Sequence, residues 1–273
     1  MAQKIIIQAD KNQWNIQFKE LIEYRELIGM LAWRDIMEQY KQAFFGIVWA
    51  IIRPLFSVLV YTLIFSKVAK LSSSGIPYPL FTLCGVVAWN FFQTSLDQST
   101  NSLLNNSNLL TKVYFPRLVI PIASLGRGAI DFFISFILLI LLMIFYGYMP
   151  SFRIISFPFF LATGLFLILG FGCFFSALCA KYRDIKFAVP FLLQIWFWLT
   201  PVAYGMENIP NTLKTFFYLN PMTWIIQGFR WSLLNSGEMD WIRFFITFLF
   251  SLLILLTGII YFGKKEREFA DII

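Results

Sequence analysis

Residues 118–146 read LVIPIASLGRGAIDFFISFILLILLMIFY, and residues 241–262 read WIRFFITFLFSLLILLTGIIYF. The hydrocarbon core of a bilayer is about 30 Å thick, and a helix needs roughly 20 mostly apolar residues to cross it. Both runs meet that length. Because a crossing segment must satisfy its own backbone polar groups, both are expected to be helical. With 59% hydrophobic residues in the chain, they indicate an all-α polytopic membrane protein.

Six segments of the chain have this apolar character, and an even number of crossings leaves both termini on one side of the membrane. Lys and Arg residues outside these segments are more numerous on that side, so the positive-inside rule places both termini in the cytoplasm. The net charge of +7 then belongs to inner loops rather than to a nucleic-acid surface. The six predicted spans lie at about 44–66, 78–97, 118–147, 155–180, 187–204 and 241–262.

The N-terminal part of the chain is predicted to lie on the cytoplasmic face. Within residues 16–42, Leu27, Ile28 and Leu31 recur near helical spacing between charged positions. This pattern is typical of an amphipathic helix at a membrane surface. The chain therefore divides into a cytoplasmic segment with an interfacial helix and a single membrane domain. The two parts are residues 1–43 and 44–273.

The segment 205–240, between the fifth and sixth spans, differs from an ordinary loop. It contains many aromatic and aliphatic residues, yet Pro210, Pro221 and Gly228 interrupt it, so it cannot form one continuous spanning helix. Broken backbone at membrane depth is tolerated where protein buries it. We expect two short helices that re-enter the membrane from its outer side.

The composition excludes several kinds of chemistry. The chain has no histidine, which removes His-ligated metals, His-based triads and His proton relays. Cys84, Cys173 and Cys179 lie in apolar runs without paired spacing and are expected to be buried thiols. The sequence GIIYFGKK at 258–265 resembles a phosphate-binding loop, but it lacks the final Ser or Thr and follows no strand. We expect no enzyme activity, metal or cofactor in this chain, and any ATP that drives it to be hydrolysed by another chain.

Charged residues inside predicted spans are candidates for function, because a charge in the bilayer is costly unless it faces a partner or a cavity. Arg53 and Pro54 interrupt the first span. Either Arg53 has a functional role, or it extends to the inner surface while Pro54 begins the helix. Arg127 and Asp131 are four residues apart in the third span and are predicted to neutralise each other as a pair.

Aromatic residues of the second and fifth spans lie close in sequence to the amide side chains of Asn90, Gln93 and Gln194. Aromatic faces beside amides suit sugar rings, whose C–H faces stack while their hydroxyls form hydrogen bonds. The alternative is an aromatic belt at the membrane interface. The residues proposed for a glycan path are Trp89, Phe92, Trp196, Trp198 and Tyr204.

Several segments, in this order, resemble the permease subunit of type-2 ABC exporters for polysaccharides, the O-antigen, capsule and teichoic acid exporters. Thr200 stands where that family usually has Ser before proline, which keeps the hydroxyl. The ordered set covers nearly the whole chain. The segments are Trp33-Arg34-Asp35 to Tyr40, Gly46 with Trp49 and Pro54, Leu109-Leu110 to Arg117 with Pro121, Tyr182-Arg183-Asp184-Ile185, Thr200-Pro201-Val202-Ala203-Tyr204, and Leu219-Asn220-Pro221 with Arg230.

The resemblance implies half of a homodimeric channel in the cytoplasmic (inner) membrane. It also implies two copies of a cytoplasmic ABC ATPase subunit, which would hold ATP and Mg²⁺. The cargo would be a polyprenyl-diphosphate-linked glycan, O-antigen-like or capsule-like, whose diphosphate enters at the inner face. No nucleic acid is expected among the partners.

The same resemblance assigns roles at the two ends. The amphipathic helix and the polar inner loop around Asn105–Phe115 would receive the motion of the ATPase, and the broken segment 205–240 would form the outer gate. Independently of the family, three cations near the inner face could meet the diphosphate electrostatically. The coupling residues are Asn105, Leu109, Leu110, Lys112 and Phe115; the cations are Arg34, Lys41 and Arg53; the gate residues are Pro210, Pro221 and Trp224.

Three alternatives stay open beside polysaccharide export. The same architecture could move another cargo, such as a drug or a lipid, although the aromatic and amide residues favour sugar. An intramembrane transferase needs a catalytic His or an acid pair, and Asp97, Asp131 and Asp184 are too scattered to supply one. A secondary transporter predicts inverted repeats and intramembrane ion ligands, and the sequence has neither.

Overall fold

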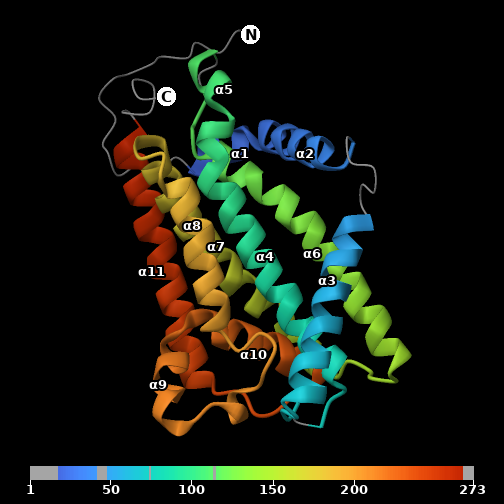
Figure 1. Cartoon of the computed structure of the whole chain (residues 1–273). Coiled ribbons are helices and arrows are strands. Elements are labelled where there is room, and N and C mark those ends of the chain that lie inside the picture. Colours follow the sequence, from blue (N-terminus) through green and yellow to red (C-terminus); the bar gives the residue numbers. More distant parts are fainter. Residues whose placement is uncertain (1–17, 42–47, 74, 113–114, 267–273) are drawn as a thin grey trace.

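The computed structural model describes residues 18–41, 48–73, 75–112 and 115–266. Within these ranges the chain forms helices and short connections, with no β-strand, so the predicted all-α architecture is confirmed there. Long helices run side by side, α2 (Arg25–Lys41) lies across one end of them, and α10 (Pro221–Leu234) lies at the other end (Figure 1). We call the end with α2 the inner end and the end with α10 the outer end.

Four helical segments are long and apolar enough to cross a membrane. Two of them coincide with the predicted spans at 118–147 and 241–262, and the other two correspond to the predicted first and fourth spans. The four are α6 (Val119–Phe145), α11 (Trp241–Lys265), α3 (Val48–Tyr61) followed by a π-helix at Thr62–Val68, and α7 (Phe157–Lys181) preceded by a 3-10 turn at Phe152–Ser156.

The other two predicted spans have different boundaries in the structure. The predicted second span ends at residue 97, whereas helix α4 (Tyr78–Asn105) continues through the polar sequence QSTNSLLN. The predicted fifth span ends at residue 204, whereas helix α8 (Ile185–Trp198) ends earlier and has only 14 residues. Such a helix is about 21 Å long, which is shorter than the hydrocarbon core. That α4 and α8 cross the membrane stays a prediction.

Short helices occupy both ends of the bundle. At the inner end, α1 (Phe18–Glu23) precedes α2, and α5 (Ser107–Lys112) follows α4. At the outer end, the two predicted short helices are confirmed as α9 (Asn211–Leu219) and α10, after a 3-10 turn at Met206–Asn208. Proline precedes α9 and begins α10, where its fixed φ and missing N–H fit a helix start. Their depth in a membrane stays a prediction.

Glycines allow close helix packing at the centre. A Cβ added at Gly128 of α6 would lie 2.1 Å from Ser95 Oγ of α4. A Cβ at Gly258 of α11 would lie 2.1 Å from the carbonyl oxygen of Gly170 in α7. A side chain at Gly258 would meet the backbone of α7 and would displace a helix, whereas one at Gly128 would first have to displace the Ser95 hydroxyl. The GIIYFGKK sequence therefore begins with a helix-packing glycine.

At the inner end, α2 packs against α6 through Ala32, since a Cβ at Gly126 would lie 2.7 Å from the Ala32 Cβ. Met30 and Trp33 of α2 are exposed, so apolar residues occupy more than one side of this helix. Its place at a membrane surface stays a prediction. A separate hydrophobic cluster joins α2 and α5 to the long helices, and its buried members are Leu31, Leu103, Leu110, Phe115, Val119, Ile120, Ala123, Cys173, Ala177, Ala180 and Phe262.

Candidate functional site

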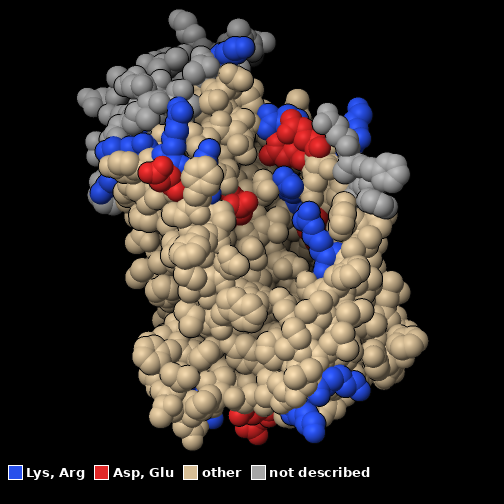
Figure 2. Space-filling view, viewed as in Figure 1, with Lys and Arg blue, Asp and Glu red and all other residues tan. Residues whose placement is uncertain are grey.

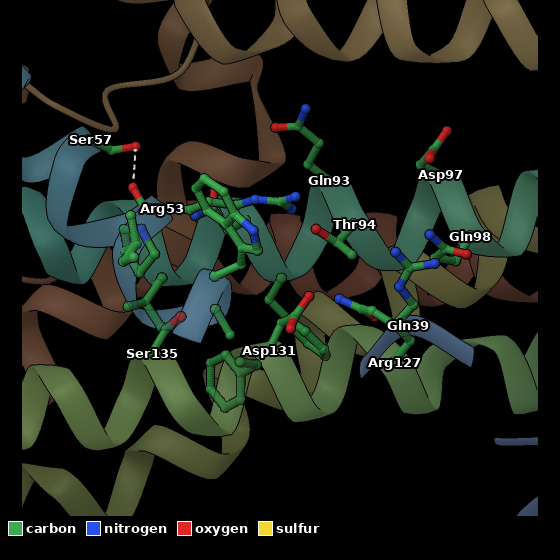
Figure 3. Close-up of a pocket in the computed structure, with 18 of the residues that line it drawn as sticks. Gln39, Arg53, Ser57, Gln93, Thr94, Asp97, Gln98, Arg127, Asp131 and Ser135 are labelled. Carbon is green, nitrogen blue, oxygen red and sulfur yellow. Dashed lines mark hydrogen bonds between the residues drawn. The ribbon is translucent and has the colours of Figure 1, made fainter. Parts of the chain in front are cut away.

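A cavity of about 1160 Å³ opens on the side of the bundle between α3, α4 and α6, with α8 at its edge. We call this cavity the groove. Figure 2 shows the bundle face as a tan surface with a hollow, beside which Lys and Arg side chains descend from the inner end. Figure 3 shows the polar side chains around the cavity. Those labelled are Gln39, Arg53, Ser57, Gln93, Thr94, Asp97, Gln98, Arg127, Asp131 and Ser135, and Asn90 also lines the cavity.

Aromatic side chains complete the groove wall. Trp49 and Phe56 come from α3, Phe91 from α4 and Phe132 from α6. Trp49, Arg53 and Phe56 are four and three residues apart, so helix geometry places them on one face of α3. The wall thus offers hydrogen-bond donors, acceptors and flat apolar faces. Such a surface can bind a polyhydroxylated ring through both its hydroxyls and its C–H groups.

The predicted pairing of Arg127 with Asp131 is wrong. The described residues include no ion pair between them within 4.0 Å, and the Asp131 carboxylate instead accepts a hydrogen bond from the Tyr40 hydroxyl at the end of α2. Burial raises the pKa of Tyr40, and its hydrogen bond to Asp131 raises it further. The hydroxyl therefore keeps its proton and acts as the donor that links α2 to α6.

The three cations proposed for the diphosphate lie in different places. Arg53 lines the groove, and no hydrogen bond or ion pair to its guanidinium occurs among the described residues. Arg34 lines a second cavity of about 400 Å³ beneath α2, where it is already bonded to Asp35 and Asn106. Lys41 is exposed at the end of α2 and lines neither cavity. Of these three cations, Arg53 is therefore the one that lines the groove without a partner among the described residues.

The two cavities share part of their lining. Gln39, Gln98 and Arg127 contribute to both, so polar surface continues from beneath α2 into the groove. Ser102 and Asn106 extend this surface towards the end of α4. A hydrophilic group at the inner end could therefore reach the groove without crossing an apolar barrier.

The proposed glycan-path aromatics are mostly core residues. Trp89 and Phe92 are each 1% exposed, pack against Trp196 and line neither cavity. Trp196 Nε1 donates to Asn220 Oδ1 at 2.9 Å. This placement favours a structural role for all three. Their sequence neighbours Asn90 and Gln93 do line the groove, so the amide half of the proposed pattern faces the cavity while its aromatic half does not.

Trp198 and Tyr204 lie at the end of α8. Trp198 is 55% exposed, and its carbonyl oxygen accepts a hydrogen bond of 2.8 Å from the Tyr204 hydroxyl. The Tyr204 ring lies near Phe65 and Phe217, with ring centroids 6.3 Å apart in both pairs. The outer end of α8 thus has an aromatic border, but neither Trp198 nor Tyr204 lines the groove.

The proposed coupling residues gather at the inner end. Leu110 and Phe115 are buried in the inner hydrophobic cluster, with Leu109 packed against it. Asn105 and Lys112 are exposed. The α5 region therefore has a buried side that attaches it to the bundle and an exposed side that a partner could contact.

The proposed gate residues separate into two groups at the outer end. Pro221 and Trp224 are buried in α10, and Trp224 Nε1 donates to the carbonyl oxygen of Tyr218 at 2.9 Å. Pro210 is exposed at the start of α9, a helix with no buried residue. The predicted gate therefore consists of a buried helix, α10, and an exposed helix, α9.

Arg230 is an unusual residue of α10, because its side chain is fully buried. Its guanidinium donates to the carbonyl oxygens of Pro201 at 2.9 Å, of Val202, and of Phe81 at 3.3 Å, and it stacks on the Phe81 ring. Pro201 and Val202 lie in the turn after α8, where no helix supplies donors to their carbonyl oxygens. Arg230 supplies these donors and places a cation near the C-terminal end of α8, which is the negative end of its dipole.

Comparison with known proteins places the chain in a family. A model of the ABC-2 type transporter family matches residues 26–234. The O-antigen export system permease protein RfbA of Myxococcus xanthus is 30% identical over 78% of this chain and 82% of its own length. Its counterpart in Klebsiella pneumoniae is 26% identical over 91% and 95% of the two chains. The polysialic acid transport protein KpsM of Escherichia coli is 22% identical over 88% and 93%. The chain therefore belongs to the ABC-2 type transporter family.

Proposed function

We propose that this chain is the permease subunit of an ATP-driven exporter, and that it moves a polyprenyl-diphosphate-linked polysaccharide of the O-antigen or capsule kind across the cytoplasmic membrane. The groove is the observation that carries the proposal. The relatives are named for O-antigen export and polysialic acid transport, which supports a polysaccharide cargo here.

The composition of the groove fits a sugar chain better than a purely apolar or purely anionic cargo. Polar groups inside a membrane protein are costly unless they face a cavity or a partner, and Asp97, Arg127 and Asp131 line this cavity together with amides and hydroxyls. Cations and acids of both signs beside aromatic faces can exchange hydrogen bonds with many successive hydroxyls. Arg53 is the residue best placed to contact the diphosphate, through a charge-assisted hydrogen bond.

The proposed topology has six crossings, with α4 and α8 added to the four long apolar helices. The turn after α8 would complete its crossing at the outer side. The beginning of the described chain and the end of α11 both lie at the inner end (Figure 1), which supports an even number of crossings with both termini in the cytoplasm. In this topology α9 and α10 re-enter from outside and form the gate.

The proposed partners are a second copy of this chain and two cytoplasmic ABC ATPase subunits. The groove is open along one side of the single chain, and a second copy would enclose it. The ATPase subunits would hold ATP and Mg²⁺ and would act on α5. This chain would have no catalytic activity of its own.

Deleting the gene in its own host tests the proposal. We expect lipid-linked glycan to accumulate inside the cytoplasmic membrane while surface glycan is lost, with recovery on return of the wild-type gene. Asn90→Leu, in the groove, should restore export poorly, whereas the matched change Gln194→Leu, on an exposed face of α8 outside the groove, should restore it. Unchanged surface glycan without internal accumulation would reject the polysaccharide and direct attention to another cargo, such as a lipid or a drug.

A further inference from the structure

A single residue joins α4 to α5 at the inner end. α4 ends at Asn105 and α5 begins at Ser107, and Asn106 between them has φ −110° and ψ 20°. The Asn106 carbonyl oxygen accepts hydrogen bonds from the amides of Leu109 and Leu110 at 3.0 and 3.2 Å, which begin α5. The position of α5 relative to α4 therefore depends on how Asn106 is held.

The side chain of Asn106 is held by an arginine from a distant part of the chain. Its Nδ2 donates to the carbonyl oxygen of Ser102 at 2.9 Å, which leaves Oδ1 as an acceptor. Arg34 Nη2 donates to that oxygen at 2.6 Å. Asp35 orients the guanidinium, because its Oδ1 accepts from both Nε and Nη2 of Arg34, at 3.0 and 2.6 Å. A charged donor makes such bonds stronger than neutral ones.

Arg34 extends from a helix that is fixed to another part of the bundle. Ala32 of α2 packs at Gly126 of α6, and the Tyr40 hydroxyl donates to Asp131 of α6. α2 is therefore anchored on α6, while Arg34 reaches from it to the joint between α4 and α5. The hydrogen bond from Arg34 to Asn106 thus connects α2 with that joint.

We propose that Arg34 is a positioning residue for transport, which ties the α4–α5 joint to α2 so that α2, the end of α4 and α5 move as one unit. This rests on the proposed function, in which the partner ATPase acts on α5. The sequence suggested instead that Arg34 contacts the cargo. Two of its guanidinium nitrogens are already engaged by Asp35 and Asn106, which favours the positioning role.

The first experiment measures the amount of glycan moved per ATP hydrolysed, with the permease and its ATPase purified as a complex and placed in lipid vesicles. Arg34→Met keeps much of the side-chain length but removes the donors. We expect transport per ATP to fall about tenfold, since a hydrogen bond to a charged group is lost, while assembly and ATP hydrolysis persist. Arg25→Gln, an exposed arginine at the start of the same helix, should leave the ratio unchanged. A normal ratio in Arg34→Met would overturn the proposal.

A charge-pair variant separates positioning from a general effect on stability. Arg34→Lys alone should lower the ratio, and adding Asn106→Asp should recover part of it, because lysine can pair with a carboxylate; the double-mutant cycle isolates that contact. If Arg34 only stabilised the fold, the thermal midpoint would fall in Arg34→Met and the transport ratio would not.

A second measurement does not depend on the cargo. Spin labels on cysteines placed at Arg25 and Asn108, both exposed, report the distance between α2 and α5 while the intact complex turns over ATP. In the otherwise wild-type protein we expect one narrow distance distribution throughout, and in Arg34→Met a broad one. A broad distribution in both would overturn the proposal. If the distribution is narrow in the otherwise wild-type protein and broad in Arg34→Met, but the complex moves no glycan, the proposed function would be rejected and the role of Arg34 would stand.

Discussion

Two arginines of this protein, Arg230 and Arg53, differ in burial and in hydrogen bonding. Arg230 is 1% exposed and donates to carbonyl oxygens in the turn after α8 and in α4. Arg53 lies on the groove wall, and its guanidinium has no described partner. A buried charge requires full hydrogen bonding, whereas a charge on a cavity wall can remain available for a ligand. The hydrogen-bonded arginine thus belongs to the fixed outer end of the bundle, and the arginine without a described partner belongs to the groove.

The same contrast holds for aromatic residues. Phe92 is 1% exposed and packs against Trp89 and Trp196, while Phe56 is 64% exposed on the groove wall. Residue type and hydrophobic surroundings are similar in the sequence, but only one of the two phenylalanines can contact a cargo. Substitutions in matched pairs can therefore distinguish structural residues from transport residues.

Replacing Arg230 should have the largest effect. Arg230→Met leaves the carbonyl oxygens of Pro201 and Val202 without donors, and each buried unsatisfied group costs about 1–3 kcal/mol. We expect a loss of roughly 3–5 kcal/mol in total, seen as a large fall in the thermal unfolding midpoint of the detergent-purified protein. Arg230→Lys should lose less, because it retains a cation and three donors. An unchanged midpoint in Arg230→Met would show that the hydrogen bonds of Arg230 do not stabilise the fold.

The two phenylalanines should differ in stability and in export. Phe92→Ala opens a cavity in the core and should cost about 3–5 kcal/mol. Phe56→Ala removes little packing and should change the midpoint only slightly while reducing export. Both are measured by thermal unfolding together with surface glycan per amount of membrane protein. Equal losses of stability would contradict the division between core and groove.

Substitution of Gly85 tests whether the turn after α8 is held against α4. A Cβ there would lie 2.3 Å from the Val202 carbonyl oxygen and 2.8 Å from Arg230 Nη2. Gly85→Ala should therefore displace the turn from Arg230 and cost about 1–3 kcal/mol through overpacking. Gly164→Ala is the control, because its nearest neighbour would be Ile225 Cγ2 at an ordinary 3.7 Å. A tolerated Gly85→Ala would mean that the turn is not held against α4.

Replacing Arg53 should have the smallest effect on stability. Arg53→Gln removes an exposed charge without breaking a described contact, so the unfolding free energy should change by less than about 0.5 kcal/mol. Export should nevertheless fall about tenfold, as expected for one lost charge-assisted hydrogen bond. Lys67→Gln, an exposed cation further along the same helical segment and outside the groove, should export normally. Equal export by both variants would argue against a ligand contact at Arg53.

Hydrophobic runs predicted the long helices well, because α6 and α11 depend mainly on local apolar length. The end of α8 at Trp198 was not predictable in this way, since Arg230 satisfies the carbonyls that follow it from a distant helix. The polar continuation of α4 to Asn105 was missed because hydropathy marks the membrane boundary and not the helix boundary.

The groove was only partly predictable. Arg53 was identified because a charge stands out in an apolar run, and Trp49 and Phe56 could have been found from their helical spacing to it. The Arg127–Asp131 pair failed because Tyr40, far away in sequence, takes the carboxylate. The burial of Trp89 and Phe92 was not predictable, because spacing along α4 does not reveal which face meets α8 and which meets the groove.

Photo-crosslinking in cells is the most direct test that the groove carries the glycan. A photoreactive amino acid is placed at Phe56, on the groove wall, and separately at Phe133, which is similarly exposed (59% against 64%) but lies on α6 outside the groove lining. We expect light-dependent attachment of glycan to the protein labelled at position 56 and none at position 133. Attachment at position 133 alone, or equal attachment at both, would contradict the groove as the glycan path.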